Sequence, residues 1–217
     1  MCIGRNIADI GTDHAYLPCY MAENNLCDFA LACDVAEMPL ESARTHILQS
    51  GFSNKITAVL SDGLQNVSRG NLTDVVMAGM GGELIASIID KCLWAKDKEN
   101  PVNFILQPMT KWDVLRKWLY DNGFAVNDEK ACKEGRFVYS VMSVKFIGRT
   151  PEYKCDLEYL YFGFVKYNSE DEKEYIQRQI SRLETAGNGM LGTDGKREKG
   201  REMLELAKSV REKYNIK

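Results

Sequence analysis

The chain has little of what metal sites, disulfide frameworks and membrane spans require. Its 217 residues include only two histidines, His14 and His46, and seven cysteines that are scattered and form no Cys-x-x-Cys pair. Zinc sites and disulfide-bonded folds need closely spaced or paired ligands, so we expect no metal site and free thiols in a reducing compartment. No apolar stretch reaches the roughly 18 residues of a membrane span, and no signal peptide opens the sequence. We therefore expect a soluble, cytoplasmic protein with no membrane partner.

Acidic and basic residues are nearly equal in number over the whole chain, but the basic ones are concentrated near its C-terminal end. The formal net charge is −3, from 28 Lys and Arg against 31 Asp and Glu, whereas residues 178–217 hold 10 basic against 6 acidic side chains. Solvated helices often carry such an excess, so the basic tail alone indicates no partner. The length allows one α/β domain with a core of its own and a smaller appendage.

Short apolar runs alternate with segments of helical periodicity. The apolar runs predict strands at 7–10, 29–33, 56–60, 74–78 and 102–106. Residues 39–50 and 110–122 predict helices, the second with a capping pattern from Thr110 to Asp113. Strands that alternate with helices indicate a parallel sheet.

The second half of the chain changes pattern. Apolar segments at 124–130 and 137–146, joined by Glu134-Gly135-Arg136, predict an antiparallel hairpin at one edge of the sheet. Beyond it, two apolar stripes at helical spacing flank a glycine-rich segment at 187–195, which predicts a loop between two amphipathic helices. We expect two domains, residues 1–150 and residues 151–217.

The first predicted strand ends at Gly11, and helix-compatible residues follow at once. A glycine at this junction lets a ligand approach the backbone N–H groups and the positive end of a helix dipole. Asp34 closes the next strand, about 20 residues further on, where Rossmann-like folds hold the ribose of a nucleoside. The two residues together predict a nucleoside-cofactor site.

The residues after Gly11 favour S-adenosylmethionine over a dinucleotide. A dinucleotide fold carries Gly-x-Gly-x-x-Gly, so that the pyrophosphate can lie against the helix. Here Asp13 would repel a pyrophosphate, whereas its carboxylate suits the cationic amino-acid end of S-adenosylmethionine.

Five segments in register resemble the bacterial TrmK family. They are DIGTDHAYLP (9–18), ACDV (32–35), LSDGL (60–64), AGMGG (78–82) and ILQP (105–108). TrmK proteins are S-adenosylmethionine-dependent tRNA (adenine-22-N1)-methyltransferases. The resemblance implies a class I, Rossmann-like methyltransferase sheet with an antiparallel edge hairpin, followed by a C-terminal α-helical hairpin that engages tRNA. Family members usually carry a helical segment before the first strand, and this chain begins almost at that strand.

We expect three groups of site residues, of which the resemblance implies the first. The cofactor group is Asp9, Gly11, Thr12, Asp13, Asp34, Val35, Asp62, Gly63, Ala78 and Gly79. The catalytic group, which we expect beside the reacting base, is His14, Tyr16, Met80 and Gln107. The group expected to contact tRNA phosphates, which spacing places on shared helix faces, is Arg178, Arg182, Arg197, Arg201 and Lys208. Structural readings compete with these roles: a capped strand end for Asp34, a plain turn for Asp62, and capping or packing for His14 and Tyr16.

The AGMGG segment favours attack by a ring nitrogen. Enzymes that methylate an exocyclic amine typically carry an Asn or Asp with two prolines and an aromatic residue at this place, and this chain does not. Adenine N1 has a lone pair and no proton to lose, so proximity and electrostatics would carry the reaction without a general base. Tyr16 could stack on a base flipped out of the tRNA.

We therefore predict a cytoplasmic, monomeric tRNA (adenine-N1)-methyltransferase. One alternative is a class I methyltransferase acting on a small molecule, which would not need the basic helical extension. The other is a non-catalytic tRNA-binding protein, which would not need to retain Gly11, Asp34 and Asp62 together.

Overall fold

The computed structural model describes residues 1–216, which form two compact units. The first unit comprises Met1–Asp128 and Val141–Tyr153. The second unit comprises Glu129–Ser140 and the described chain from Lys154 onward. The predicted division at residue 150 stays a prediction, and the structure shows that residues 129–140 pack with the C-terminal segment.

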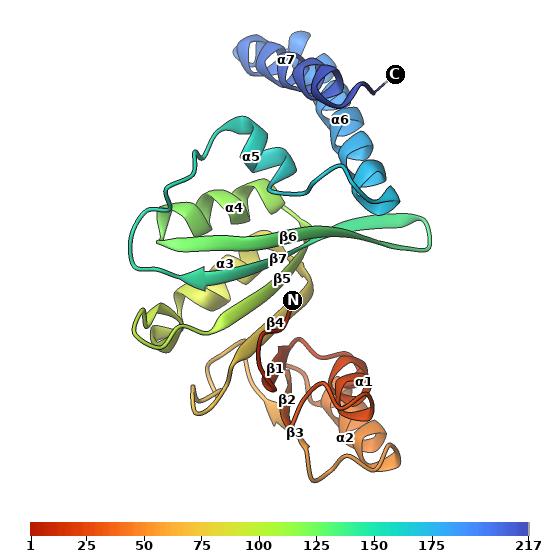
Figure 1. Ribbon diagram of the computed structural model, residues 1–217, viewed down its shortest axis with the longest axis vertical. Coiled ribbons are helices and arrows are strands. Elements are labelled where there is room, and N and C mark those ends of the chain that lie inside the picture. Colours follow the sequence, from red (N-terminus) through yellow and green to blue (C-terminus); the bar gives the residue numbers. More distant parts are fainter. Residues whose placement is uncertain (217) are drawn as a thin grey trace. The chain divides into compact units, whose positions relative to one another are not determined.

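A seven-stranded sheet has the strand order β3-β2-β1-β4-β5-β7-β6 (Figure 1). The strands are β1 (Asn6–Ile10), β2 (Phe29–Asp34), β3 (Ile56–Leu60), β4 (Asp74–Gly81), β5 (Asn103–Thr110), β6 (Phe124–Glu134) and β7 (Phe137–Phe146). The first five strands pair in parallel, and β7 is antiparallel to β5. The strand order reverses between β1 and β4, and ligands of open α/β sheets bind beside the carboxyl ends of strands at such a point. The predicted class I methyltransferase fold is confirmed.

The central strands are almost wholly apolar because they are covered on both faces. Ile7, Met77, Phe104 and Leu106 are all fully buried. Helices alternate with the strands, as a parallel sheet requires: α1 (Tyr16–Glu23), α2 (Glu37–Gln49), α3 (Gly82–Asp90) and α4 (Trp112–Asp121), with a short 3₁₀ helix, η1 (Leu93–Lys96).

A buried polar network holds the amino ends of the central strands. The Asp74 carboxylate accepts hydrogen bonds from the backbone N–H groups of Ile3 and Gly4 and from the Asn103 amide, which in turn accepts one from the Ser143 hydroxyl. Because these buried polar groups are hydrogen-bonded to one another, the network stabilises the amino ends of β4 and β5.

The predicted cap of α4 is wrong. Thr110 pairs with Gly81 as the last residue of β5, so it cannot also cap the helix. Lys111 precedes the helix instead, with a φ of 57° and without a side-chain cap.

The predicted edge hairpin is confirmed, with β6 extending to Glu134 and Gly135 turning at a φ of +56°. Its tip, residues 129–140, contributes the buried Val138 to the core of the second unit.

Three helices make up the rest of the second unit: α5 (Leu157–Phe162), α6 (Glu170–Leu191) and α7 (Arg197–Tyr214). Ser169 and Glu172 form a capping box at the start of α6.

The prediction of a loop over 187–195 is wrong, because α6 continues to Leu191. Gly187 is a buried helical residue whose Cβ would lie 2.9 Å from the Gly200 carbonyl oxygen, so the glycine permits close packing of α6 on α7.

Candidate functional site

The loop after β1 presents bare backbone at the point where the strand order reverses. Gly11 is exposed with a φ of +76°, and a Cβ there would lie 2.3 Å from the Met80 methyl carbon at the end of β4. The N–H groups of Gly11 and Thr12 both donate to the Cys33 carbonyl, each at 2.8 Å. The structure thus brings the predicted residues Gly11 and Met80 together, and the positive φ favours glycine at position 11.

The two acidic residues on either side of Gly11 differ in exposure. Asp9 is buried, and its carboxylate accepts a 2.7 Å hydrogen bond from the Thr12 hydroxyl. Burial raises the pKa of Asp9 to about 6, and the hydrogen bond from Thr12 opposes the rise. The Asp13 side chain is 81% exposed, with one oxygen 3.3 Å from His14 Nε2. Asp13 is therefore the solvent-exposed acid of the two, whereas Asp9 is buried against Thr12.

An aromatic cluster follows the loop. The rings of His14 and Tyr16 stack at 5.4 Å, and the Tyr16 ring meets His46 of α2 edge-on at 5.1 Å. Ala15 takes the N-cap position of α1, and no side chain caps it, so the capping alternative for His14 is wrong. Tyr16 remains 60% exposed, which leaves ring surface available to a planar ligand.

The ends of β2 and β3 add polar and apolar groups to the same edge. One Asp34 carboxylate oxygen accepts the Ala36 N–H at 2.8 Å, and the following Val35 is 66% exposed. Asp62 is exposed on a turn at Gly63, whose φ is +58°. The Ser61 N–H donates to the Asp34 carbonyl, which links the two turns.

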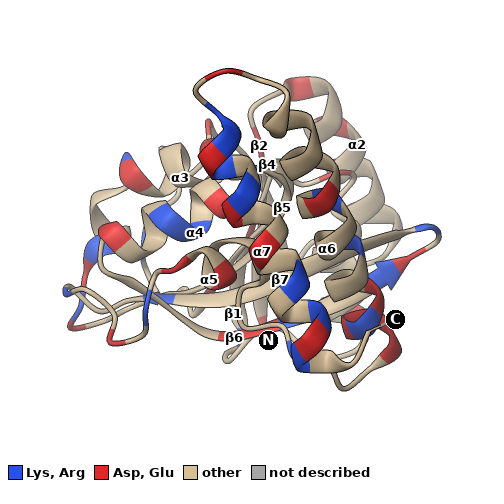
Figure 2. Ribbon diagram, turned by 90° about the horizontal axis from the view of Figure 1, so that it is seen from above, with Lys and Arg blue, Asp and Glu red and all other residues tan. Residues whose placement is uncertain are grey.

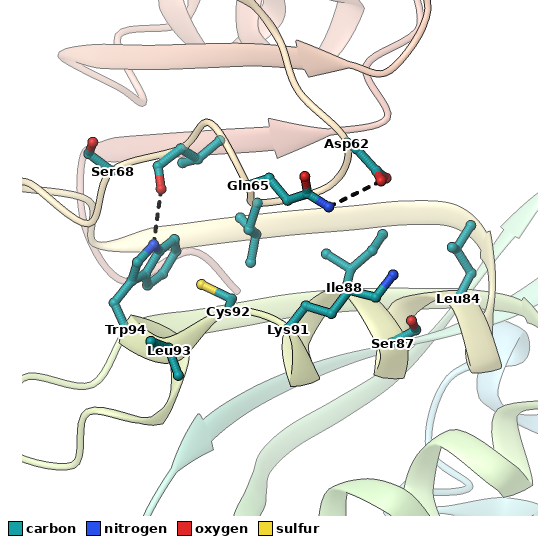
Figure 3. A pocket seen from close by; sticks show the side chains of 12 residues that line it. Asp62, Gln65, Ser68, Leu84, Ser87, Ile88, Lys91, Cys92, Leu93 and Trp94 are labelled. Atoms are coloured by element: carbon teal, nitrogen blue, oxygen red, sulfur yellow. Dashed lines mark hydrogen bonds between the residues drawn. The ribbon is translucent and has the colours of Figure 1, made fainter.

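A pocket of about 360 Å³ adjoins Asp62 (Figure 3). Gln65 lies beside Asp62 and donates to its carboxylate at 3.2 Å. Leu84 and Ile88 line the pocket from α3, and Lys91 lines it from just past the end of that helix. Sequence reasoning missed the α3 residues. The available signal in the sequence was Leu84, an apolar residue beside the apolar stripe of Ile85, Ile88 and Ile89.

The end of β4 is open backbone. Gly79 has a φ of +77°, and a Cβ there would meet no atom within 4 Å. Gln107 of β5 lies against it, since its Oε1 accepts the Gly79 N–H at 2.8 Å. The predicted residues Ala78, Gly79 and Gln107 therefore lie together at the carboxyl edge, and Gln107 holds the glycine backbone in place.

The predicted phosphate-binding side chains are largely engaged with neighbours in the second unit. Arg178 contacts Glu174 and the Arg136 carbonyl, both at 2.6 Å, and Arg182 donates to Gln179 at 3.3 Å. Arg197 pairs with Asp194 at 3.2 Å and Lys208 with Glu212 at 3.9 Å. Charges of both signs mark α6 and α7 (Figure 2).

Arg201 is exposed on α7. Because surface ion pairs contribute little free energy, tRNA phosphates could replace the acidic side chains that pair with these basic residues.

The hairpin tip adds two basic residues that the sequence reasoning missed. Lys133 pairs with Glu174 at 2.7 Å, and the Arg136 guanidinium lies 5.0 Å from the centre of the Phe137 ring. The segment Lys130–Phe137, basic and ending in an aromatic residue, carried that signal in the sequence.

Two features are absent from the part of the chain that the structure describes. No helix in residues 1–216 is long and apolar enough to cross a bilayer. Nor do three or more His, Cys, Asp or Glu side chains in that range gather as a metal-binding group.

A Rossmann-like sheet with glycine turns and acids at its carboxyl edge is typical of proteins that bind a nucleoside cofactor. The sequence model of the methyltransferase domain family matches residues 2–142, and the chain belongs to this family.

Comparison with individual proteins is more specific. A tRNA (adenine(22)-N(1))-methyltransferase of Bacillus subtilis is 37% identical over 140 residues, which cover 64% of this chain and 58% of that protein. The chain thus spans less than two thirds of this relative's length. The crystal structure of B. subtilis m1A22 tRNA methyltransferase TrmK matches with a TM-score of 0.78 at 26% identity, over 96% of this chain and 93% of that chain.

A Streptococcus pneumoniae protein solved in complex with S-adenosyl-L-methionine matches with a TM-score of 0.80 at 30% identity, over 95% of this chain and 92% of that chain. The predicted resemblance to TrmK is confirmed.

Proposed function

We propose that the protein transfers a methyl group from S-adenosylmethionine to N1 of an adenine in tRNA, at position 22 by similarity to its relatives. The observation that carries this proposal is the assembly of the predicted glycines and acids at one edge of the sheet, in a chain 37% identical to an enzyme of that name. The proposed partner, tRNA, implies a cytoplasmic location.

The residues at the carboxyl edge fit this cofactor. The exposed Gly11 and the open space over Gly79 leave room for a ligand against backbone at the ends of β1 and β4. Asp34 supplies a carboxylate for the ribose hydroxyls, Asp13 for the cationic amino-acid end, and Asp62 for the adenine amino group. S-adenosylmethionine supplies an activated methyl group when bound.

The side chains of the site would bind and orient rather than move a proton. Adenine N1 attacks through a lone pair, so a general base is not required, and alignment lowers the barrier. Gln107 uses its Oε1 to hold Gly79, and its Nε2 donates to the Met109 sulfur at 3.5 Å, which leaves the second Nε2–H as a donor for a base. The exposed ring of Tyr16 suits stacking on a flipped adenine, an interaction worth about 1–3 kcal/mol.

Methylation of unmodified tRNA with labelled S-adenosylmethionine tests the proposal. We expect label on a single adenine, mapped to position 22 by nuclease digestion and mass spectrometry, and none on a matched tRNA with guanine at that position. Label transferred to a small molecule in a cell extract but not to tRNA would favour the small-molecule methyltransferase. Binding of tRNA without transfer would favour the non-catalytic protein.

A further inference from the structure

The loop between β1 and α1 is held from outside at both ends. At its start, the Gly11 and Thr12 N–H groups donate to Cys33 of β2. At its end, the His14 carbonyl lies 2.7 Å from Nδ1 of His46, a residue 32 positions later in α2. No motif or spacing in the sequence marks His46 for this contact.

The second attachment holds a backbone that L residues rarely adopt. His14 and Ala15 have φ values of 53° and 54°, so two consecutive non-glycine residues are left-handed. Such residues persist only where their surroundings hold them. Ala15 is fully buried, and the His46 imidazole is the side chain that bonds the His14 backbone.

The hydrogen bond determines the state of the imidazole. A carbonyl oxygen only accepts, so Nδ1 of His46 must carry the proton. The ring is half-buried, with the edge of Tyr16 packed against it. The bond therefore joins the cofactor loop to the helix that follows Asp34, the predicted ribose ligand.

We propose that His46 is a positioning residue of the cofactor site, whose Nδ1–H holds the His14 carbonyl and thereby sets the direction of Asp13. Thr12 is turned inward to Asp9, and the two fastened ends leave Asp13 as the outward residue of the loop. This inference rests on the proposed function, since it assigns Asp13 to the cationic end of S-adenosylmethionine.

Two amide substitutions separate the hydrogen bond from the bulk of the side chain. His46→Asn places an amide nitrogen near the position of Nδ1, whereas His46→Gln carries its amide one carbon further and cannot reach the same place. Glutamine is also the better helix former, so loss of affinity in H46Q cannot be attributed to a weakened α2. Gln49→Ala, an exposed change one turn along α2, is the matched control.

Calorimetry with S-adenosylmethionine, without tRNA, gives the first readout. We expect H46Q to bind roughly tenfold more weakly than wild type, the effect of losing one hydrogen bond, and H46N and Q49A to bind within about twofold. Steady-state kinetics should show a raised KM for the cofactor, with kcat and the KM for tRNA unchanged. Nitrogen NMR of the wild-type imidazole should show the proton on Nδ1.

Three results would overturn the proposal: H46Q binding as tightly as wild type, H46N as weak as H46Q, or a neutral ring protonated on Nε2. Failure of the proposed function has a different signature. Wild-type protein that binds no S-adenosylmethionine would refute that function and the role of His46 with it.

Discussion

Asp9 makes the stability of the first unit depend on pH. Its carboxyl group has a pKa raised from 3.8 to about 6, first through burial. Between these values the native state holds a proton that the unfolded state has lost, so stability falls as the pH rises from about 4 to above 6. The pKa shift corresponds to a loss of roughly 3 kcal/mol at most in the free energy of unfolding.

We expect Asp9→Asn to remove this dependence while keeping an oxygen for the Thr12 hydroxyl. Urea unfolding should show equal stability of the two proteins near pH 4 and a more stable variant at pH 7. A variant less stable than wild type at pH 7 would mean that the ionised carboxylate has a favourable partner in the native state.

Asp34 offers a test of ribose binding that leaves the local turn intact. In Asp34→Asn the amide oxygen can still accept the Ala36 N–H, but the charge that would bind two hydroxyls is gone. We expect calorimetry to show S-adenosylmethionine affinity reduced by about 1.5–3 kcal/mol, the range for hydrogen bonds to charged groups. Asp34→Ala should lose more.

Asp28→Asn, an exposed change just before β2, provides the control. The Asp28 carboxylate pairs with Arg5, which is not one of the predicted cofactor residues. Unchanged affinity in Asp34→Asn would remove Asp34 from the site.

At the scale of elements, the packing of α6 on α7 depends on two glycines. A Cβ on Gly187 would lie 2.9 Å from the Gly200 carbonyl oxygen, and one on Gly200 would lie 2.8 Å from the Gly187 carbonyl oxygen. Alanine at either position must separate the helices, so we expect a loss of about 1–3 kcal/mol in unfolding free energy, measured by denaturation with circular dichroism.

Gly189 is the matched control, because it lies in the same helix with no atom within 4 Å of its Cβ position. Gly189→Ala should be stabilising by about 0.5–1 kcal/mol. Equal effects at positions 187 and 189 would show that helix propensity, and not packing, determines the result.

For the whole molecule, the two units divide the proposed functions between them. The predicted cofactor residues all belong to the first unit, and the predicted tRNA-contacting arginines to the second. A chain truncated after Tyr167 should retain S-adenosylmethionine binding and lose tRNA binding, as measured by calorimetry and filter binding. Binding of tRNA by the intact protein should fall steeply with salt, because phosphate contacts release counterions.

Truncation also uncovers apolar side chains, since Val138 packs in one cluster with Tyr175 and Ile176 of α6. A truncated chain carrying Val138→Ser controls for aggregation. Normal tRNA methylation by either truncated form would contradict a role for the helices in substrate binding.

The sequence alone determined the strands of the sheet, several of the helices and the order of the site residues, but it did not predict α3 or α5. Strand and helix periodicities are local, and they placed all seven strands because each strand buries its own apolar residues. Gly11, Asp34 and Asp62 each follow a parallel strand, and the carboxyl ends of parallel strands meet at one edge. Their clustering could therefore be deduced without knowledge of any long-range contact.

Tertiary structure decided the features that depend on distant partners. Thr110 joined β5 rather than capping α4 because it pairs with Gly81, and Gly187 stayed helical because α7 packs against it. The hairpin tip joined the second unit through Val138. The link from His46 to the His14 carbonyl spans 32 positions, and no spacing rule predicts it, since the packing of α2 beside the loop brings the two groups together.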